Sequence, residues 1–157
     1  MNYIELQDYP LHWVYKRADM GITEADLATI KPMTSSFANQ VWQRDISAEA
    51  IDLDRLEDSD WLSDNSHWPK TENWERAFDS EEQALPETLA GHLNWDPQTV
   101  VFVCYDAEHI IETRYGTLQR NWKAFLFAAE QALVLGRRRK EALWFIDESK
   151  VKLGQRD

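Results

Sequence analysis

The pattern of apolar and polar side chains in the last third of the chain predicts β-strands. Residues 99–106 read TVVFVCYD, a run of β-branched and aromatic residues with turn-forming residues before it, which is typical of a buried strand. Residues 109–115 form a second run after only two intervening residues, so we predict an antiparallel hairpin. Apolar runs at residues 142–146 and 151–154 predict two more strands.

Capping residues and helical spacing predict helices in the first hundred residues. Thr23 and Thr34 each stand directly before a segment with helical spacing and can act as N-caps. Pro86 opens a segment in which Leu89 and Leu93 share one helical face. These three segments are therefore predicted to be short helices.

Two other segments have distinct patterns. Residues 11–16 alternate large apolar residues with smaller or polar ones, which predicts a strand. Thr71 is placed to cap a helix that carries Trp74 and Phe78 on one face.

Residues 47–72 are the part of the chain least suited to regular structure. They are dense in Asp, Glu and Ser, with Trp61 and Trp68 embedded among them. The segment is predicted to be a loop held down by its tryptophans, with room for one short helix.

Residues 117–135 fit two interpretations. Leu118, Trp122 and Phe125 keep helical spacing. The same segment can also be divided into two strands, residues 124–127 and 132–135. Periodicity does not decide between these interpretations for apolar runs this short.

These elements together predict an α+β fold in a single domain, residues 1–157. We expect an antiparallel sheet formed mainly by residues 99–153, with helices from residues 23–93 packed on one of its faces. A chain of 157 residues fits one domain with a real hydrophobic core.

Charge is distributed very unevenly along the chain. Residues 1–98 hold 20 acidic and 7 basic residues, whereas residues 99–157 hold 8 acidic and 10 basic ones. The net charge of −11 argues against nucleic acid and anionic membranes as partners, because like charges repel. An acidic surface accelerates association with a basic protein.

The acidic middle of the chain is the first candidate site. Exposed tryptophans are frequent anchors in protein interfaces, and here they lie among carboxylates. The candidate partner-binding residues are Asp58, Asp60, Trp61, Asp64 and Trp68.

A basic run is the second candidate site. Arg137, Arg138 and Arg139 are followed by Lys140, and Arg120 precedes them by 17 residues. The run fits a solvated turn, internal neutralisation of the acidic residues 47–82, or contact with a phosphate or carboxylate ligand, which arginine grips with its planar fork.

Other chemistry-bearing residues point to structural roles. Cys104 lies within the best predicted strand, so an inert buried thiol is expected. Asp106 and His109 could act as an acid–base pair, but their position at a hairpin equally suits a solvated turn. The four histidines lack the spacing of zinc ligands. We predict no metal, no cofactor and no catalytic residue.

The compartment is predicted to be the cytoplasm. The single cysteine rules out a disulfide within the chain. The N-terminal residues lack the apolar run of a signal peptide, and no stretch is apolar enough to cross a membrane.

The sequence resembles one known family. The stretches VFVCYDAEHIIETRYG, RNWKAFLF, LGRRRK and the closing KLG, together with YI…LHWVYK…MGITEADLATIKPMT near the start, are similar to a family of uncharacterised bacterial proteins, mainly gammaproteobacterial, known as domain of unknown function 2947. The resemblance implies no activity. Members of that family carry turn-forming residues near positions 128–132, where this chain has the helix-forming stretch AAEQA. The resemblance favours the two-strand interpretation of residues 117–135, while the departure from it favours the helix.

Two functions remain as hypotheses. The first is a non-catalytic binding module, an accessory or inhibitor-type protein that uses the acidic, tryptophan-rich surface to bind a basic protein. The alternative is a small enzyme or small-molecule binder that acts on an anionic ligand near Arg120, Arg138 and Arg139.

Overall fold

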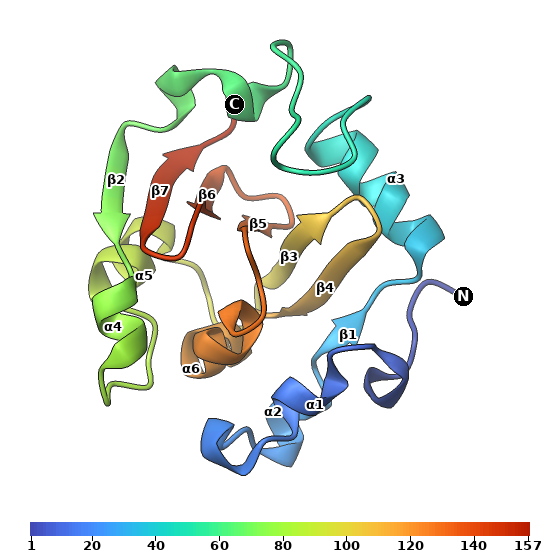
Figure 1. The fold of residues 1–157 in the computed structure, drawn as a ribbon, viewed down its shortest axis with the longest axis vertical. Coiled ribbons are helices and arrows are strands. Elements are labelled where there is room, and N and C mark those ends of the chain that lie inside the picture. Colours follow the sequence, from blue (N-terminus) through green and yellow to red (C-terminus); the bar gives the residue numbers. More distant parts are fainter.

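A computed structural model describes all 157 residues and places a seven-stranded sheet at the centre of the molecule (Figure 1). Every pair of neighbouring strands is antiparallel, and the order across the sheet is β1-β4-β3-β5-β6-β7-β2. The strands are β1 (Lys31–Pro32), β2 (Lys70–Asn73), β3 (Val100–Asp106), β4 (His109–Arg114), β5 (Ala132–Gly136), β6 (Glu141–Phe145) and β7 (Lys150–Gln155). The α+β class and the hairpin of β3 and β4 are therefore confirmed.

The helices are short and lie around the sheet. Six are α-helical: α1 (His12–Tyr15), α2 (Glu24–Leu27), α3 (Ser35–Asp45), α4 (Glu75–Asp79), α5 (Glu87–Leu93) and α6 (Tyr115–Leu126). Four single turns of 3₁₀-helix are η1 (Leu6–Asp8), η2 (Ala18–Met20), η3 (Trp61–Ser63) and η4 (Asn65–His67). No helix combines the length and apolar character that crossing a bilayer requires.

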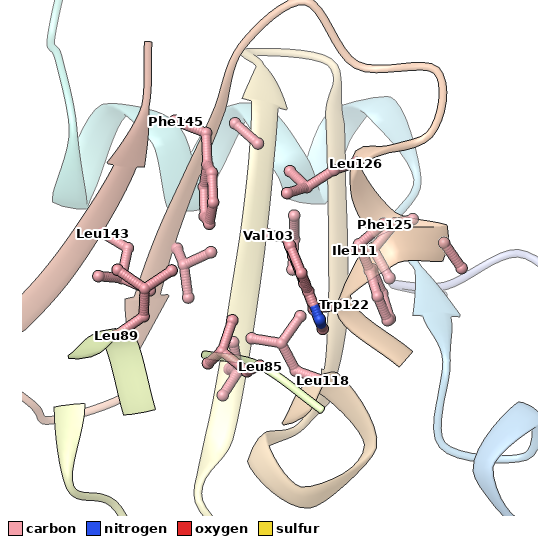
Figure 2. Close-up of a cluster of buried hydrophobic side chains, with 14 of the residues drawn as sticks. Leu85, Leu89, Val103, Ile111, Leu118, Trp122, Phe125, Leu126, Leu143 and Phe145 are labelled. Atoms are coloured by element: carbon pink, nitrogen blue, oxygen red, sulfur yellow. The ribbon is translucent and has the colours of Figure 1, made fainter. Parts of the chain in front are cut away.

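The strict alternation of side chains along the strands produces two separate hydrophobic cores. Val101 and Val103 of β3 point into one core, and Phe102 and Cys104 point into the other. The first core includes side chains of α1, α5 and α6 (Figure 2). The second includes side chains of α3 and of the segment that follows it.

The prediction that helices cover one face of the sheet is therefore wrong. Ala38, Val41 and Trp42 of α3 are fully buried against the face opposite α6, and Figure 2 shows α3 passing behind the strands. The cause is the sequence of β3, which is apolar at consecutive positions and so must be buried on both faces.

The predicted strand at residues 11–16 is also wrong, because this segment forms α1. Pro10 lacks an N–H and has a fixed φ, which suits the first turn of a helix. The amide of His12 donates to the carbonyl oxygen of Tyr9 at 3.0 Å and closes that turn. Val14 and Tyr15 are buried as a result, while Trp13 is exposed.

The caps predicted for α2 and α3 are confirmed, whereas the cap predicted for α4 is not. The hydroxyl groups of Thr23 and Thr34 accept hydrogen bonds from amides three residues later. Thr71 instead pairs with Lys152 within β2, so α4 begins only after Trp74. The helix predicted to open at Pro86 is α5, and Leu89 and Leu93 are both buried.

Residues 117–135 form a helix in their first part and a strand in their last part, so each interpretation is correct for one part. The first part belongs to α6, so the strand predicted at 124–127 is wrong, and the strand predicted at 132–135 is β5. The hydroxyl of Tyr105 donates to the carbonyl oxygen of Phe125 at 2.5 Å and satisfies one of the carbonyls that a helix end leaves unpaired. Phe127, which the two-strand interpretation placed in the core, is 38% exposed.

A polar network fixes the path of α6 over the sheet. Asn121 has a non-helical backbone, and its side-chain amide donates to the carbonyl oxygen of Thr117 and to the carboxylate of Asp26, both at 2.9 Å. The guanidinium of Arg120 donates twice to the same carboxylate, at 2.7 and 3.0 Å. Asp26 is only 6% exposed, so this network ties α2 to the kink in α6.

Replacing Asp26 tests this network. The hydrogen bonds from Arg120 are the main cause that keeps the pKa of Asp26 below its ordinary value, although burial raises it. Hydrogen bonds from Asn121 and Thr117 lower it further. A carboxylate with a lowered pKa stabilises the fold above its unfolded-state pKa, and that contribution is lost as pH falls through its folded-state pKa. We expect Asp26→Asn to lower the free energy of unfolding at pH 7 by about 1–3 kcal/mol, and by less near pH 3.

Urea unfolding of both proteins at the two pH values measures this difference. Asp19→Asn is the control, because Asp19 pairs with Arg17 on the surface and should change stability less. An equal loss at pH 7 and pH 3 would show that the charge of Asp26 does not stabilise the fold.

Candidate functional site

The tryptophans of the predicted partner-binding site pack inside the molecule. Trp68 is buried, with 7% of its surface exposed, and Trp61 is half-buried. Their rings stack with a centroid distance of 5.4 Å, and Trp68 also packs on Trp144 of β6 at 5.5 Å. A Cβ atom at Gly154 of β7 would collide with the carbonyl oxygen of His67, so this segment lies directly on the sheet.

The carboxylates of the same segment have different environments. Asp60 is 9% exposed and accepts a hydrogen bond from the amide of Glu57 at 2.8 Å. Asp64 accepts one from the amide of Ser66 at 2.9 Å. Asp58 is exposed and has no side-chain hydrogen bond. The prediction of a loop held down by tryptophans is confirmed, and of the predicted site residues the segment offers a partner Asp58, Asp64 and part of Trp61.

The structure does not bring the predicted anion-binding residues together. Arg137, Arg138 and Arg139 lie exposed in the turn between β5 and β6, where Arg138 has a left-handed φ of 61°. They form no ion pair with the acidic residues 47–82. Arg120 lies on α6 and is paired with Asp26. The basic run is therefore an exposed turn that does not neutralise the acidic residues 47–82.

Cys104 is completely buried in the second core. Burial, with a smaller effect of Asp45, raises the pKa of its thiol well above the ordinary value. A protonated thiol with no access to solvent is a poor nucleophile, which agrees with the structural role expected for it.

A large cavity lies elsewhere, where four segments distant in the sequence meet. Its volume is about 580 Å³, within the range of small-ligand pockets. The walls come from residues 9–15, residues 52–54, the turn between β3 and β4, and the stretch from the end of α6 to β5. We call this cavity the acidic pocket, because it is lined by Asp52, Asp54, Asp106 and Glu130 and by no lysine or arginine.

Backbone pairing forces two of these carboxylates together. Asp52 and Asp106 face each other in an isolated antiparallel bridge, and the amide of Ala107 donates to the carbonyl oxygen of Ile51 at 3.0 Å. Residues paired in this way have Cβ atoms about 5 Å apart. These side chains therefore start close together at a rim that has no lysine or arginine, and such a rim favours a cation.

The other rim residues are held in place by hydrogen bonds. The side-chain amide of Gln131 donates to Asp54 and accepts, through its oxygen, a hydrogen bond from the indole of Trp144 at 3.0 Å. The imidazole of His109 hydrogen-bonds Asp106 at 2.8 Å. Glu130 is exposed. None of the four carboxylates is within ion-pairing distance of a lysine or arginine.

Tyrosines and Phe125 form the inner wall. Tyr9 is 6% exposed and Tyr15 is 3% exposed. Burial is the main cause that raises the pKa of Tyr9 to about 12, and the Asp106 carboxylate contributes a smaller part. Burial likewise raises the pKa of Tyr15, whose hydroxyl lies near that of Tyr105. The inner part of the pocket therefore presents neutral hydroxyl groups beside aromatic faces.

Exposed apolar side chains lie on the segments that line the pocket. Only five large hydrophobic residues are exposed, and Met1 is one of them. Leu11 lines the pocket, and Ile51 precedes the rim residue Asp52. Trp13 and Phe127 pack edge to face at 6.0 Å, next to the pocket walls in both α1 and the end of α6. Exposed apolar groups concentrated beside one pocket are typical of an interaction site.

Comparison with known proteins places this chain in a family. Residues 3–154 match the family described as "Protein of unknown function (DUF2947)". The chain belongs to the DUF2947 family. No curated protein and no solved structure matches the chain. The resemblance seen in the sequence is thus confirmed, and for this DUF2947 protein any function must be argued from the site itself.

Sequence reasoning found only part of the acidic pocket of this DUF2947 protein. Asp106 and His109 were considered, but Tyr9, Asp52 and Glu130 were not. The one signal for Asp52 was the acidity of its segment, which contains 12 acidic residues between positions 47 and 82. Which of these face a pocket depends on the bridge to Asp106, and no local pattern encodes that bridge.

The tryptophan stack makes a testable contribution to stability. We expect Trp68→Ala to lower the free energy of unfolding by about 3–5 kcal/mol, because it removes a buried aromatic ring and leaves a cavity. Trp13→Ala is the matched control on an exposed residue and should cost far less. Urea denaturation measures both, and equal losses would contradict the assignment of Trp68 to the core.

Thiol labelling tests the burial of Cys104. We expect a thiol reagent to modify the native protein slowly and the urea-unfolded protein quickly, because the native thiol is buried and protonated. Rapid labelling of the folded protein at pH 7 would mean that the thiol is accessible and reactive.

Proposed function

We propose that this DUF2947 protein is a non-catalytic binding module for a basic protein partner, which docks over the acidic pocket. The observation that carries the proposal is the lining of that pocket, which has four carboxylates and no lysine or arginine, with exposed apolar side chains at Leu11 of the lining and at Trp13 and Phe127 on the segments that form it. A partner that supplies cations to the carboxylates and covers these apolar side chains would satisfy both features.

The charge of the whole chain supports a basic partner. Residues 1–98 carry a net charge of −13, and they contribute Asp52 and Asp54 to the pocket. A field of this sign accelerates the approach of a basic surface and is weakened by salt, with a screening length of about 8 Å at physiological ionic strength. The proposal keeps the basic partner inferred from the sequence but moves the contact from Trp61 and Trp68 to the acidic pocket.

The lining of the pocket also supports a role in binding rather than catalysis. It contains no serine, threonine, cysteine or lysine, so the Asp106–His109 pair has no aliphatic hydroxyl, thiol or amine to activate there. The alternative function, action on an anionic ligand, has less support. It relied on Arg120, Arg138 and Arg139, and these residues lie in separate places with Arg120 already paired.

Site-directed photo-crosslinking tests the proposed function. A photoreactive amino acid at Trp13, expressed in the source organism, should crosslink to a protein whose crosslinked peptide is rich in lysine or arginine. The same group at Thr71, on the far edge strand β2, is the control and should give no such product. Asp52→Asn with Glu130→Gln should weaken the crosslink, as should added salt.

Two results would contradict the proposed function. One is crosslinking at Trp13 no stronger than at Thr71. The other is a crosslinked partner whose contacting peptide is acidic.

A further inference from the structure

The lining of the acidic pocket also indicates which cation it binds, and this inference rests on the proposed function. We propose that it binds the guanidinium group of an arginine side chain carried by the partner, with the side chain inserted between the carboxylates of the rim and the tyrosines of the inner wall.

The first support is an unpartnered hydroxyl group inside the pocket. Tyr9 lines the cavity and is 94% buried, since 6% of it is exposed. Its hydroxyl forms no hydrogen bond within the protein. The side-chain polar atoms that are sealed from solvent without a hydrogen bond are the Thr99 hydroxyl and the Trp122 indole nitrogen. The Tyr9 hydroxyl is not among them, so it is accessible to solvent. The Tyr9 hydroxyl therefore reaches the cavity and is free to bond a ligand.

The second support is the arrangement of acceptors. Asp52 and Asp106 approach from one side through their backbone bridge, and Glu130 comes from the stretch between α6 and β5. Tyr9 lies close enough to Asp106 for the carboxylate to raise the pKa of its hydroxyl. A planar guanidinium offers five N–H donors in a fixed fork and can bond several of these acceptors together, whereas an ammonium offers three.

The third support is the aromatic wall. Tyr15 and Phe125 pack edge to face with a centroid distance of 5.3 Å and line the cavity. A guanidinium is weakly hydrated and stacks on aromatic faces, so it enters such a site more readily than a strongly hydrated ammonium. The surface next to the pocket contains the same pairing, because the guanidinium of Arg17 lies 4.5 Å from the ring centre of Phe127 while bonding Asp19.

The experiment uses capped amino acids as probes of the whole protein. N-acetyl-arginine amide, the lysine equivalent and the citrulline equivalent are titrated into isotopically labelled protein, and amide chemical shifts are followed at low salt. Citrulline has the shape of arginine without its charge. For a ligand of about 15 non-hydrogen atoms we expect an arginine Kd on the order of 1 mM. Shifts should be confined to residues 9–15, 52–54, 105–109 and 124–131.

The relative affinities of the three probes distinguish guanidinium binding from binding of any cation. The lysine probe should bind about tenfold more weakly than the arginine probe, and the citrulline probe should show no binding. Tyr9→Phe, which removes only the free hydroxyl, should weaken arginine binding about three- to tenfold. Asp52→Asn should weaken it at least tenfold. Glu72→Gln, on the far edge strand β2, is the charge-matched control and should leave the Kd unchanged.

Three results would overturn the inference: equal binding of lysine and arginine, arginine shifts outside these residues, or unchanged affinity in both pocket variants. These failures differ from those of the proposed function. A basic partner crosslinked at Trp13 without selective arginine binding would refute the guanidinium inference alone. Selective arginine binding without a basic partner at Trp13 would refute the docking proposal alone.

Discussion

Burial of β3 on both faces is the constraint on which the rest of the structure depends. Val101 and Val103 require apolar cover on one side, while Phe102 and Cys104 require it on the other. A sheet buried in this way needs two covering layers. Here α6, α5 and α1 cover one face, whereas α3 and the segment after it cover the other. The chain must therefore cross the edges and ends of the sheet several times.

The acidic pocket is a consequence of those crossings. The segment after α3 reaches the end of β3 and pairs there, at Asp52 with Asp106. The stretch after α6 returns to the sheet at the same end, next to residues 9–15. Each crossing is fixed by hydrogen bonds that belong to the fold, including the one from Tyr105 to the end of α6. The cavity is thus a product of the fold, and its lining is set by which residues lie at the crossings.

Acidic residues have two kinds of environment in this protein. Most that are partly buried are satisfied by the fold itself: Asp26 accepts from Arg120, Asn121 and Thr117, and Asp60 accepts from a backbone amide. In the acidic pocket, Asp52 and Asp106 also accept from backbone amides, but none of the four carboxylates pairs with a lysine or arginine. That contrast distinguishes a charge cluster that supports the fold from one arranged to meet something outside it.

The sequence by itself determined the elements whose pattern is local. The period of two in β3, the threonine caps of α2 and α3, and the apolar face of α5 all act within a few residues, so they were predicted correctly. Tertiary structure decided the rest. The segment predicted as a strand at residues 11–16 forms α1 because Pro10 starts a turn and because the helix buries Val14 and Tyr15 in the first core. Residues 124–127 stayed helical because the sheet needed cover there and Tyr105 satisfied the helix end. The acidic pocket was decided at the same level, since its carboxylates meet only through contacts between residues more than fifty positions apart, and such contacts leave no periodic trace in a sequence.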